Sequence, residues 1–91
     1  MRRQDRAATI AFSRQAWVDY QYWVQHDRTV ARRIARLIEE CLRDPFQGLG
    51  NPEPLKHELS GCWSRRITKE HGFVYQVTGG QCVIIQCRYH Y

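Results

Sequence analysis

The chain carries a carboxylate and an imidazole, in two separate segments, with the chemistry needed to break a phosphodiester bond. Glu53 lies in NPEPLK, where a proline on each side restricts the backbone. His90 lies in the closing CRYHY, next to the terminal carboxylate, which favours the protonated imidazole. Without a metal, cleavage of RNA through its 2′-OH requires one group that removes a proton and one that supplies a proton. Glu53 fits the base and His90 the acid, although Glu53 can equally be an ordinary loop residue.

Basic and aromatic side chains of the same segments would complete such a site. Lysine and arginine position phosphate groups and neutralise their charge, and aromatic rings stack on unpaired bases. The candidates for these contacts are Lys56, Arg65, Arg66, Arg88 and Tyr91. A mixed basic surface is also typical of a face that meets only solvent, and Arg65 can lie on the side opposite Arg66. These residues alone therefore leave the ligand open.

The composition predicts one small domain with an anionic partner. The chain has 91 residues and a formal net charge of +5, and its three Trp, five Tyr and three Phe supply much of the area that a small core must bury. The charge suits nucleic acid, a ribosome or an acidic protein segment without choosing among them. No apolar run approaches the length of a membrane span, and we expect no signal peptide.

The four cysteines indicate a reduced, cytoplasmic protein. Cys41, Cys62, Cys82 and Cys87 form no C-x-x-C pair and nothing else signals secretion, so we expect them to be small core residues. The spacings of Cys and His match no common zinc site, and Asp and Glu form no cluster suited to Mg²⁺. We expect no metal and no other cofactor.

Two helices are predicted in the first half of the chain. In residues 13–27 aromatic residues recur at helical spacing after Ser13, which can cap the helix. In residues 27–45 an apolar stripe recurs at the same spacing, with Asp27 able to cap its start and Pro45 stopping it. The core residues predicted for the first helix include Trp17, Tyr20 and Trp23. Those predicted for the second are Val30, Ile34, Leu37, Ile38 and Cys41.

A sheet accounts for the segments that alternate with period two. Such alternation predicts strands at 9–13, 62–68, 71–78 and 81–91, and a further strand at 55–60. Gly79 and Gly80 predict a tight hairpin turn, and residues 45–55, which hold all three prolines, predict a loop. The predicted fold class is α+β, with two N-terminal helices packed on one face of a twisted antiparallel sheet.

The last predicted strand would fix the end of the chain in place. By alternation, the side chains facing the core would be Val83, Ile85, Cys87 and Tyr89. Arg88 and His90 would then project from the open face of the sheet, about 7 Å apart.

Several motifs taken together resemble one known family. The stretch PFQGLGNPEPLKHELSGCWSRRITKEH is followed by VY and by the closing CRYHY, and the first predicted helix contains WVDYQYW, a W-x-x-Y-x-x-W pattern. The combined pattern resembles the YoeB family of toxins within the RelE-like superfamily. It covers residues 9–91 as a single domain and leaves residues 1–8 as a flexible N-terminal extension.

The resemblance implies a RelE-like fold, an activity and a set of partners. The activity would be that of a type II toxin that cleaves mRNA in the A site of the ribosome by attack of the 2′-OH. The inhibitor would be an antitoxin of the YefM/Phd type, whose C-terminal segment covers the site. The toxin would form a homodimer, and it would meet operator DNA only through the antitoxin complex.

The resemblance also implies roles for individual residues. Glu53 would be the general base, His90 the general acid and Arg66 a contact to the transition state. Tyr91 would orient the RNA or His90. Further substrate contacts are expected at Lys56, Arg65 and Arg88.

One position departs from the family in a way that bears on activity. Family members usually read EHR where this chain reads EHG, so Gly72 stands where an arginine is expected to stabilise the phosphorane. Loss of one preorganised cation can cost about 10²–10³ in rate. Arg66 or another cation compensates, or the chain is a natural variant that is weakened or inactive and still binds ribosome and antitoxin, or the sequence was altered. A basic protein-interaction domain without catalysis is a further alternative.

Overall fold

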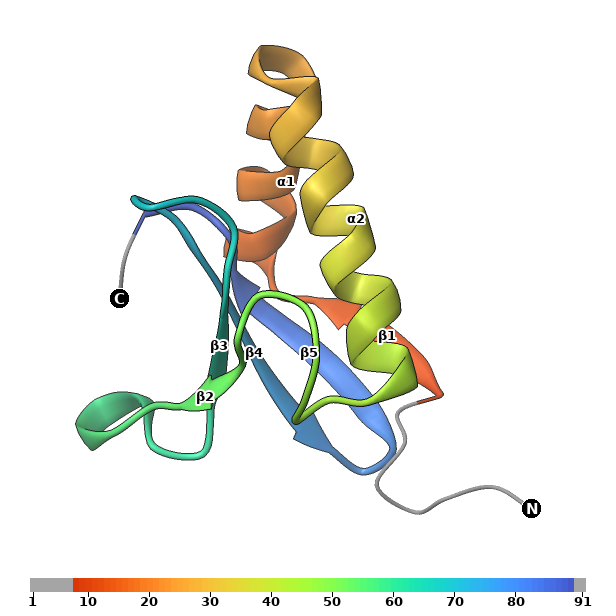
Figure 1. The fold of residues 1–91 in the computed structure, drawn as a ribbon, viewed down its shortest axis with the longest axis vertical. Coiled ribbons are helices and arrows are strands. Elements are labelled where there is room, and N and C mark those ends of the chain that lie inside the picture. The colour runs from red at the N-terminus through yellow and green to blue at the C-terminus, as the bar shows by residue number, and fades with distance from the viewer. Residues whose placement is uncertain (1–7, 90–91) are drawn as a thin grey trace.

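The computed structural model describes residues 8–89, and no helix in this range is long and apolar enough to cross a membrane. Two helices lie side by side and pack on one face of a five-stranded sheet (Figure 1). Most of the predicted extension lies outside the described range. Ala8, its last residue, donates its N–H to the carbonyl oxygen of Gly80 at 2.9 Å. The predicted α+β fold class is confirmed.

Side-chain caps determine where both helices begin. Helix α1 spans Arg14–His26 and follows Ser13, whose hydroxyl accepts the N–H of Ala16 at 3.0 Å. Helix α2 spans Arg28–Arg43 and follows Asp27, whose carboxylate accepts two backbone N–H groups of the first turn. Such caps satisfy N–H groups that have no partner within the helix. Both predicted N-caps are confirmed.

The sheet is mixed, although we predicted an antiparallel one. Its strands are β1 (Thr9–Phe12), β2 (Glu53–Pro54), β3 (Trp63–Arg66), β4 (Gly72–Thr78) and β5 (Gln81–Gln86), in the spatial order β1-β5-β4-β3-β2. Neighbouring strands are antiparallel except for β1, which pairs with β5 in parallel. Alternation within a strand carries no information on the direction of its partner. The predicted turn at Gly79 and Gly80 is confirmed, with both residues at positive φ.

A bulge in β5 changes which side chains of that strand face the core. Cys82 and Ile84 are fully buried, and the pairing with β4 then passes over Ile85. An extra residue in one strand shifts the alternation by one position, so Cys87 is the next residue to be buried. The predicted core face was therefore wrong at Val83, Ile85 and Tyr89.

Two further predictions were wrong in detail. Residues 55–60 form no strand, and a 3-10 turn, η1 (His57–Leu59), occupies part of them. Trp23 is 7% exposed, as expected of a core residue, but Trp17 is 51% exposed. The aromatic pattern of α1 therefore serves two surfaces, one buried and one open.

The core lies between α2 and the central strands. Ile34 and Leu37 of α2 are fully buried together with Phe73 and Tyr75 of β4. All four cysteines are buried free thiols, in agreement with their predicted use as core residues.

Candidate active site

Strand register brings four residues of the candidate site onto one face of the sheet. Glu53 in β2 pairs with Ser64 in β3, and Arg66 in β3 pairs with Gly72 in β4. Ser64 and Arg66 are two residues apart on one strand, so their side chains share a face. Opposed β-carbons lie about 5 Å apart and diagonal ones about 7–8 Å apart. Glu53 and Arg66 are diagonal neighbours, so their charged groups flank a space of phosphate size.

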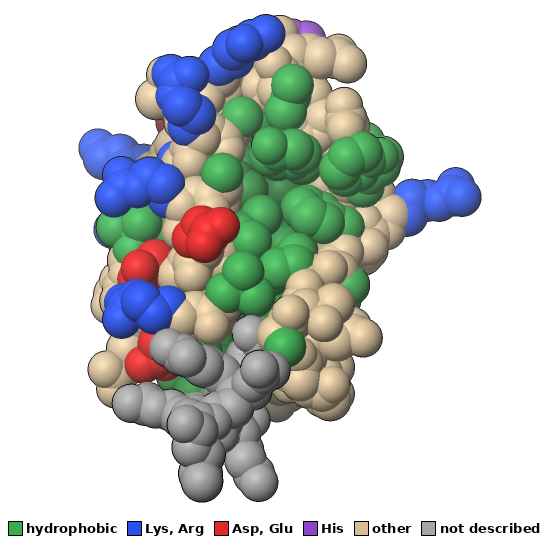
Figure 2. Space-filling view, turned by 90° about the vertical axis from the view of Figure 1, so that its right-hand side faces the viewer, with side chains coloured by type: hydrophobic (Ala, Val, Ile, Leu, Met, Phe, Trp, Pro, Cys, Tyr) green, Lys and Arg blue, Asp and Glu red, His purple; other side chains and the backbone are tan. Residues whose placement is uncertain are grey.

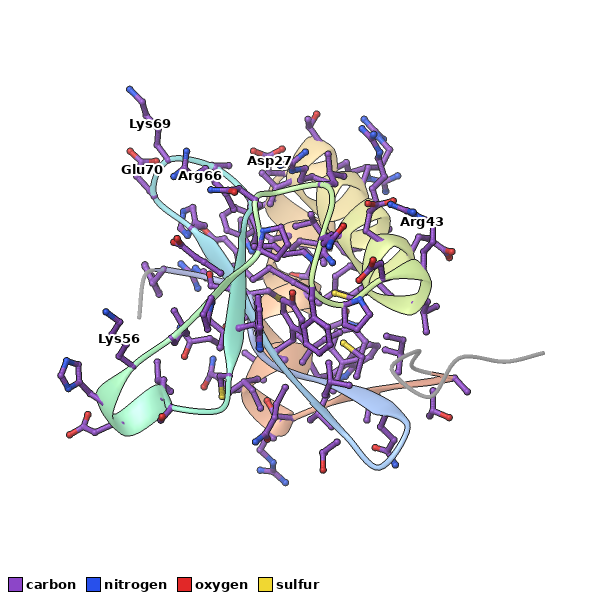
Figure 3. The ribbon with its side chains drawn as sticks, turned by 60° about the horizontal axis from the view of Figure 1, so that its bottom comes forward. Asp27, Arg43, Lys56, Arg66, Lys69 and Glu70 are labelled. Atoms are coloured by element: carbon purple, nitrogen blue, oxygen red, sulfur yellow. The ribbon has the colours of Figure 1, made fainter. Side chains whose placement is uncertain are left out.

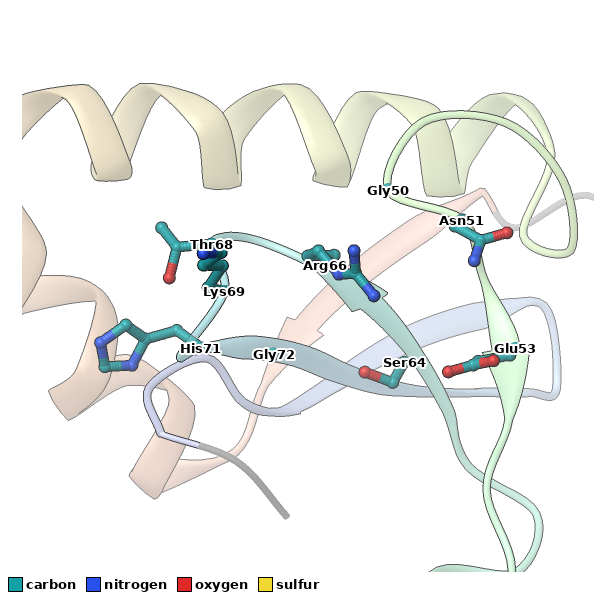
Figure 4. Close-up of a pocket in the computed structure, with 9 residues that line it drawn as sticks. All are labelled: Gly50, Asn51, Glu53, Ser64, Arg66, Thr68, Lys69, His71 and Gly72. Atoms are coloured by element: carbon teal, nitrogen blue, oxygen red, sulfur yellow. The ribbon is translucent and has the colours of Figure 1, made fainter.

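A cavity of about 90 Å³ lies on this face. Figure 4 shows the Glu53 carboxylate directed toward Ser64, whose hydroxyl points away from Glu53 along β4, with the Arg66 guanidinium extending over the same space. The cavity reaches Gly72, which stands opposite Arg66 and has no side chain of its own. The remaining lining residues include Asn51, Thr68, Lys69 and His71.

The charges around this cavity suit a single phosphodiester. Two cations, Arg66 and Lys69, line it together with one carboxylate, Glu53. The cations attract the phosphate, and the carboxylate is available to accept a proton. Within residues 8–89, no three His, Cys, Asp or Glu side chains are grouped so that they could hold a metal ion.

The backbone of Arg66 is held from two directions. Its N–H donates to the carbonyl oxygen of Gly50 at 2.7 Å, which ties β3 to the preceding loop. Its carbonyl oxygen accepts a hydrogen bond from Nη2 of Arg33, in α2, at 2.9 Å. Arg66 can therefore present its guanidinium to the cavity from a fixed base.

Gly50 allows the loop before Glu53 to lie close to β3. Its φ is +84°, and a β-carbon there would lie 3.0 Å from Cβ of Arg65 and 3.0 Å from Cδ2 of Leu37. A larger residue would be strained in this conformation and would push the loop outward. The glycine thereby contributes to the placement of Glu53 on the same face as Arg66.

Arg65 lies in the core and faces away from the cavity. It is 1% exposed, and its Nε donates to the hydroxyl of Tyr75 at 3.2 Å. Its other guanidinium nitrogens donate to the backbone carbonyl oxygens of Asp44, Gln47 and Leu49. These bonds hold the loop that follows α2 against the sheet. The structure therefore contradicts the predicted substrate contact of Arg65.

Lys56 is exposed and does not line the cavity. Figure 3 shows it near the turn η1, well apart from Arg66 and Lys69 at the other end of the site. Contact between Lys56 and the scissile phosphate itself is not supported by this position. Its role in binding a neighbouring part of the substrate stays a prediction.

Arg88 packs on the aromatic surface of α1. Its Cζ lies 3.5 Å from the ring centroid of Tyr22, and that ring stacks on His26 with centroids 4.2 Å apart. Cation–π contact of this kind holds a guanidinium beside an aromatic face. Arg88 lies outside the lining of the 90 Å³ cavity, and its predicted contact with substrate stays a prediction.

The segment that follows β5 is held at Cys87 by side chains of α1 and not by continuation of the strand. The Cys87 N–H donates to Oδ2 of the buried Asp19 at 3.0 Å, and the Cys87 carbonyl oxygen accepts from Nε1 of Trp23 at 2.8 Å. Burial, together with the nearby Asp19 carboxylate, raises the pKa of the Cys87 thiol to about 12, so this thiol stays protonated at neutral pH. His90 and Tyr91, predicted as site residues, lie outside the described residues.

Sequence reasoning missed Ser64 and His71, and only one of these two residues could have been found from the sequence pattern. Ser64 shares its strand face with Arg66, so alternation alone could have found it. No motif singled out His71, which lines the cavity just before β4 begins. Its position depends on the turn between β3 and β4, for which alternation gives no information.

Comparison with known proteins decides the family. The family model for the YoeB-like toxin of bacterial type II toxin-antitoxin system matches residues 12–91. The chain belongs to this YoeB-like family of toxins. Toxin YoeB of Streptomyces coelicolor is 55% identical over 82 residues, which cover 90% of this chain and 98% of that protein. Toxin YoeB of Escherichia coli K12 is 51% identical over 82 residues, with the same coverage of 90% and 98%.

Solved structures of YoeB proteins share the fold of this chain. The YoeB/ParE toxin from Agrobacterium tumefaciens is 46% identical, with a TM-score of 0.89 over 91% of this chain and 99% of that one. YoeB of Staphylococcus aureus, solved as a dimer and in a heterotetramer with YefM, is 42% identical with a TM-score of 0.84, covering 91% and 97%. YafQ from E. coli, at 14% identity and a TM-score of 0.68, shares the fold alone.

Proposed function

We propose that this YoeB-like toxin is an endoribonuclease that cleaves mRNA on the ribosome. The observation that carries the proposal is the register of β2, β3 and β4, which puts Glu53 and Arg66 on one face around a phosphate-sized cavity. A base and a cation at this separation suit attack within a ribonucleotide. Membership of a toxin family supports the same chemistry.

The proposed reaction uses the RNA's own 2′-OH as the nucleophile. The Glu53 carboxylate removes the 2′-OH proton, and the 2′ oxygen attacks the adjacent phosphorus. The bond from phosphorus to the 5′ oxygen breaks, and His90 gives its proton to that leaving oxygen. The products are a 2′,3′-cyclic phosphate and a free 5′-OH. Arg66 neutralises the charge that develops on the phosphorane, and Tyr91 orients the RNA or His90.

A weakened or inactive toxin is the second candidate, and Gly72 favours it. Gly72 lies directly opposite Arg66, where the family resemblance implies an arginine. The site therefore has one cation fewer at the position nearest the proposed phosphate. Such a chain would still bind the ribosome and its antitoxin while cutting slowly.

An antitoxin of the YefM type is the proposed inhibitor, and the helical face offers a surface for it. A groove of about 250 Å³ between α1 and α2 is floored by Tyr20, Val24, Ala31 and Ala35 and bordered by Arg28 and Arg32. Figure 2 shows apolar side chains gathered on this face, with Lys and Arg interspersed with some Asp or Glu along one border. Trp17 and Val18 of α1 add exposed apolar area, being 51% and 54% exposed. An acidic amphipathic segment would match both the apolar floor and the basic border.

The remaining partners follow from family membership. We propose that the toxin acts in the cytoplasm on mRNA in the ribosomal A site, and that it binds operator DNA only as part of the antitoxin complex. A homodimer is proposed because YoeB of S. aureus has been solved as a dimer.

Modified mRNA on translating ribosomes tests the proposed function. An mRNA with ribose at the cleavage position should be cut, whereas the same mRNA with 2′-deoxy or 2′-O-methyl ribose there should stay intact. Primer extension detects the cut, and cosedimentation of the toxin with the stalled ribosomes shows that the toxin is bound in each case. Cleavage of the 2′-deoxy substrate would contradict the proposed reaction. Binding without cleavage of the ribose substrate would favour the second candidate.

A further inference from the structure

The imidazole of His71 holds the backbone of the residue that precedes His90. The Tyr89 N–H donates to Nδ1 of His71 at 2.6 Å. The Tyr89 carbonyl oxygen accepts the N–H of Gly72 at 3.1 Å. The backbone N–H and carbonyl oxygen of Tyr89 are therefore both bound by two consecutive residues that line the candidate cavity.

Tyr89 needs such support because its backbone is in an unfavourable conformation. Its φ is +66°, in the left-handed region that residues other than glycine rarely adopt. Its side chain is 59% exposed, so burial of the ring in the core does not hold it there. The two hydrogen bonds to His71 and Gly72 hold its backbone in this conformation, while its ring contacts the His71 ring, with centroids 5.8 Å apart, and the Arg88 guanidinium, at 4.6 Å from the centroid.

His71 is itself held in the orientation that this contact requires. Its ring meets the ring of Trp23 edge to face, with centroids 4.8 Å apart and an interplanar angle of 80°. Its carbonyl oxygen accepts the N–H groups of Ile67 and Thr68 at 3.0 and 3.2 Å, which closes the turn between β3 and β4. The acceptor nitrogen is thus fixed by packing on α1 and by the turn before β4.

We propose that neutral His71 is a positioning residue for the proposed general acid, because it fixes the backbone of Tyr89, the residue to which His90 is joined. The effect on cleavage rests on the proposed function, whereas the clamp on Tyr89 does not. The chemistry of the contact defines the protonation state, because a backbone N–H needs an acceptor and Nδ1 accepts only when it carries no proton. Protonation of His71 turns both ring nitrogens into donors and releases Tyr89.

The charged surroundings of His71 come from four elements. Arg66 and Lys69 line the same cavity with Glu53 on its other side, Glu70 precedes His71 in the turn, and Arg88 precedes Tyr89 in the carboxyl-terminal segment. Helix α1 contributes the uncharged Trp23 ring.

Two variants separate the acceptor from the ring. His71→Asn places an amide oxygen where Nδ1 lies, so it keeps an acceptor that cannot be protonated, but it loses the ring. His71→Phe keeps a ring against Trp23 but offers no acceptor. Hydrogen exchange of the Tyr89 amide, followed by NMR from pH 5 to 8, reports the clamp directly. RNA cleavage in the same pH range reports its consequence.

We expect His71→Phe to lose the clamp on Tyr89 and His71→Asn to keep it. His71→Phe should lower the protection of the Tyr89 amide about tenfold, the equivalent of one hydrogen bond, and lower kcat by a similar factor at pH 8. His71→Asn should retain both the protection of the Tyr89 amide and kcat. Its protection factor, which is corrected for the intrinsic exchange rate, should not fall on acidification. Tyr89 protection that survives in His71→Phe, or that is lost equally in both variants, would overturn the proposal. If the Tyr89 amide is protected as predicted in each protein but none of the proteins cleaves RNA, the clamp stands and the proposed function is contradicted.

Discussion

Arg65 and Arg66 are consecutive residues of β3 whose guanidinium groups lie on opposite faces of the sheet. Arg65 is 1% exposed and donates to three backbone carbonyl oxygens and one phenol, whereas Arg66 is exposed and lines the candidate cavity. Strand alternation alone requires this separation. One arginine therefore holds the loop that leads to Glu53, and the other faces the proposed substrate.

Removing these two guanidiniums should affect different properties. Arg65→Met would leave buried carbonyl oxygens of the 44–49 loop without partners, so we expect the free energy of unfolding to fall by about 3 kcal/mol. Arg66→Met removes an exposed side chain and should change it by less than about 0.5 kcal/mol. Urea denaturation of both variants and of the parent chain measures the change in the free energy of unfolding. Equal destabilisation would contradict the assigned faces.

Cleavage by the same pair should show the reverse order. Arg66→Met should reduce the rate by about 10²–10³, because a preorganised cation is lost. Arg65→Met, assayed at a temperature where it is folded, should retain more activity than Arg66→Met. Single-turnover cleavage of one mRNA by all three proteins provides the comparison.

An arginine at position 72 should restore a missing cation. Gly72 has negative φ within β4, so its backbone can accept any L-residue. Gly72→Arg would place a second guanidinium directly opposite Arg66, and we expect cleavage to rise by about 10²–10³. The two like charges repel when no phosphate is bound, so stability should fall slightly.

Gly72→Leu is the control for this gain. Leucine fills the same cavity without adding charge, and we expect it to lower cleavage below that of the parent chain. Equal activity of the Arg and Leu variants would show that charge at this position is irrelevant, and it would remove the main argument for an arginine-deficient site.

The helices and the strands β1, β3, β4 and β5 were predictable because their signals are local, whereas β2 lies in a segment predicted as a loop. Ser13, Asp27 and Pro45 mark helix ends through side chains that act within one turn. The faces of β5 were not predictable, because the bulge at Ile85 depends on how that strand meets β4 and α1. The Ser13 hydroxyl donates to the Ile85 carbonyl oxygen at 2.7 Å, a contact across 72 residues of sequence.

Charge reversal on the helical groove should weaken the antitoxin complex without harming the fold. Arg32 borders the groove and is exposed, so Arg32→Glu should repel an acidic segment while leaving the core intact. We expect the dissociation constant for a YefM-type antitoxin to rise at least tenfold, measured by calorimetry. Arg43→Glu, on the same helix but outside the groove, is not an equivalent control because Arg43 pairs with Glu40. Arg14→Glu, exposed at the start of α1, serves instead.

Glu40 should make the stability of the loop after α2 depend on pH. Hydrogen bonds from Arg43 and from the Leu49 N–H lower the pKa of Glu40 from 4.5 to about 2. A carboxyl whose pKa is lower in the folded state stabilises the fold above its unfolded pKa, and it loses that contribution as pH falls. The advantage of the wild type over Glu40→Gln should therefore shrink as pH falls from about 4.5 to about 2.

Urea denaturation of both proteins across that range measures the difference. Because the group is at the surface, added salt should reduce the difference throughout. A difference that is constant with pH would show that the Glu40 contacts do not persist in solution.

The site itself was predictable in part. NPEPLK and SRR identified Glu53 and Arg66 as candidates, and the sheet places both on one cavity. Alternation separates Arg65 from Arg66 but does not say which of the two faces the core, because the partners of Arg65 come from a loop 16 to 21 residues earlier in the chain. The role of His71 depends on the path of the carboxyl-terminal segment, which leaves β5 after Gln86 and is turned by α1.

The central claim is that Glu53 removes the 2′-OH proton at this cavity. The most direct measurement is the cleavage rate of Glu53→Gln, in both the parent and the Gly72→Arg background, with analysis of the RNA ends. We predict 2′,3′-cyclic phosphate and 5′-OH ends from the active proteins. Glu53→Gln should slow cutting by at least about 10² in each background. Cleavage by Glu53→Gln at the unmodified rate would contradict the account.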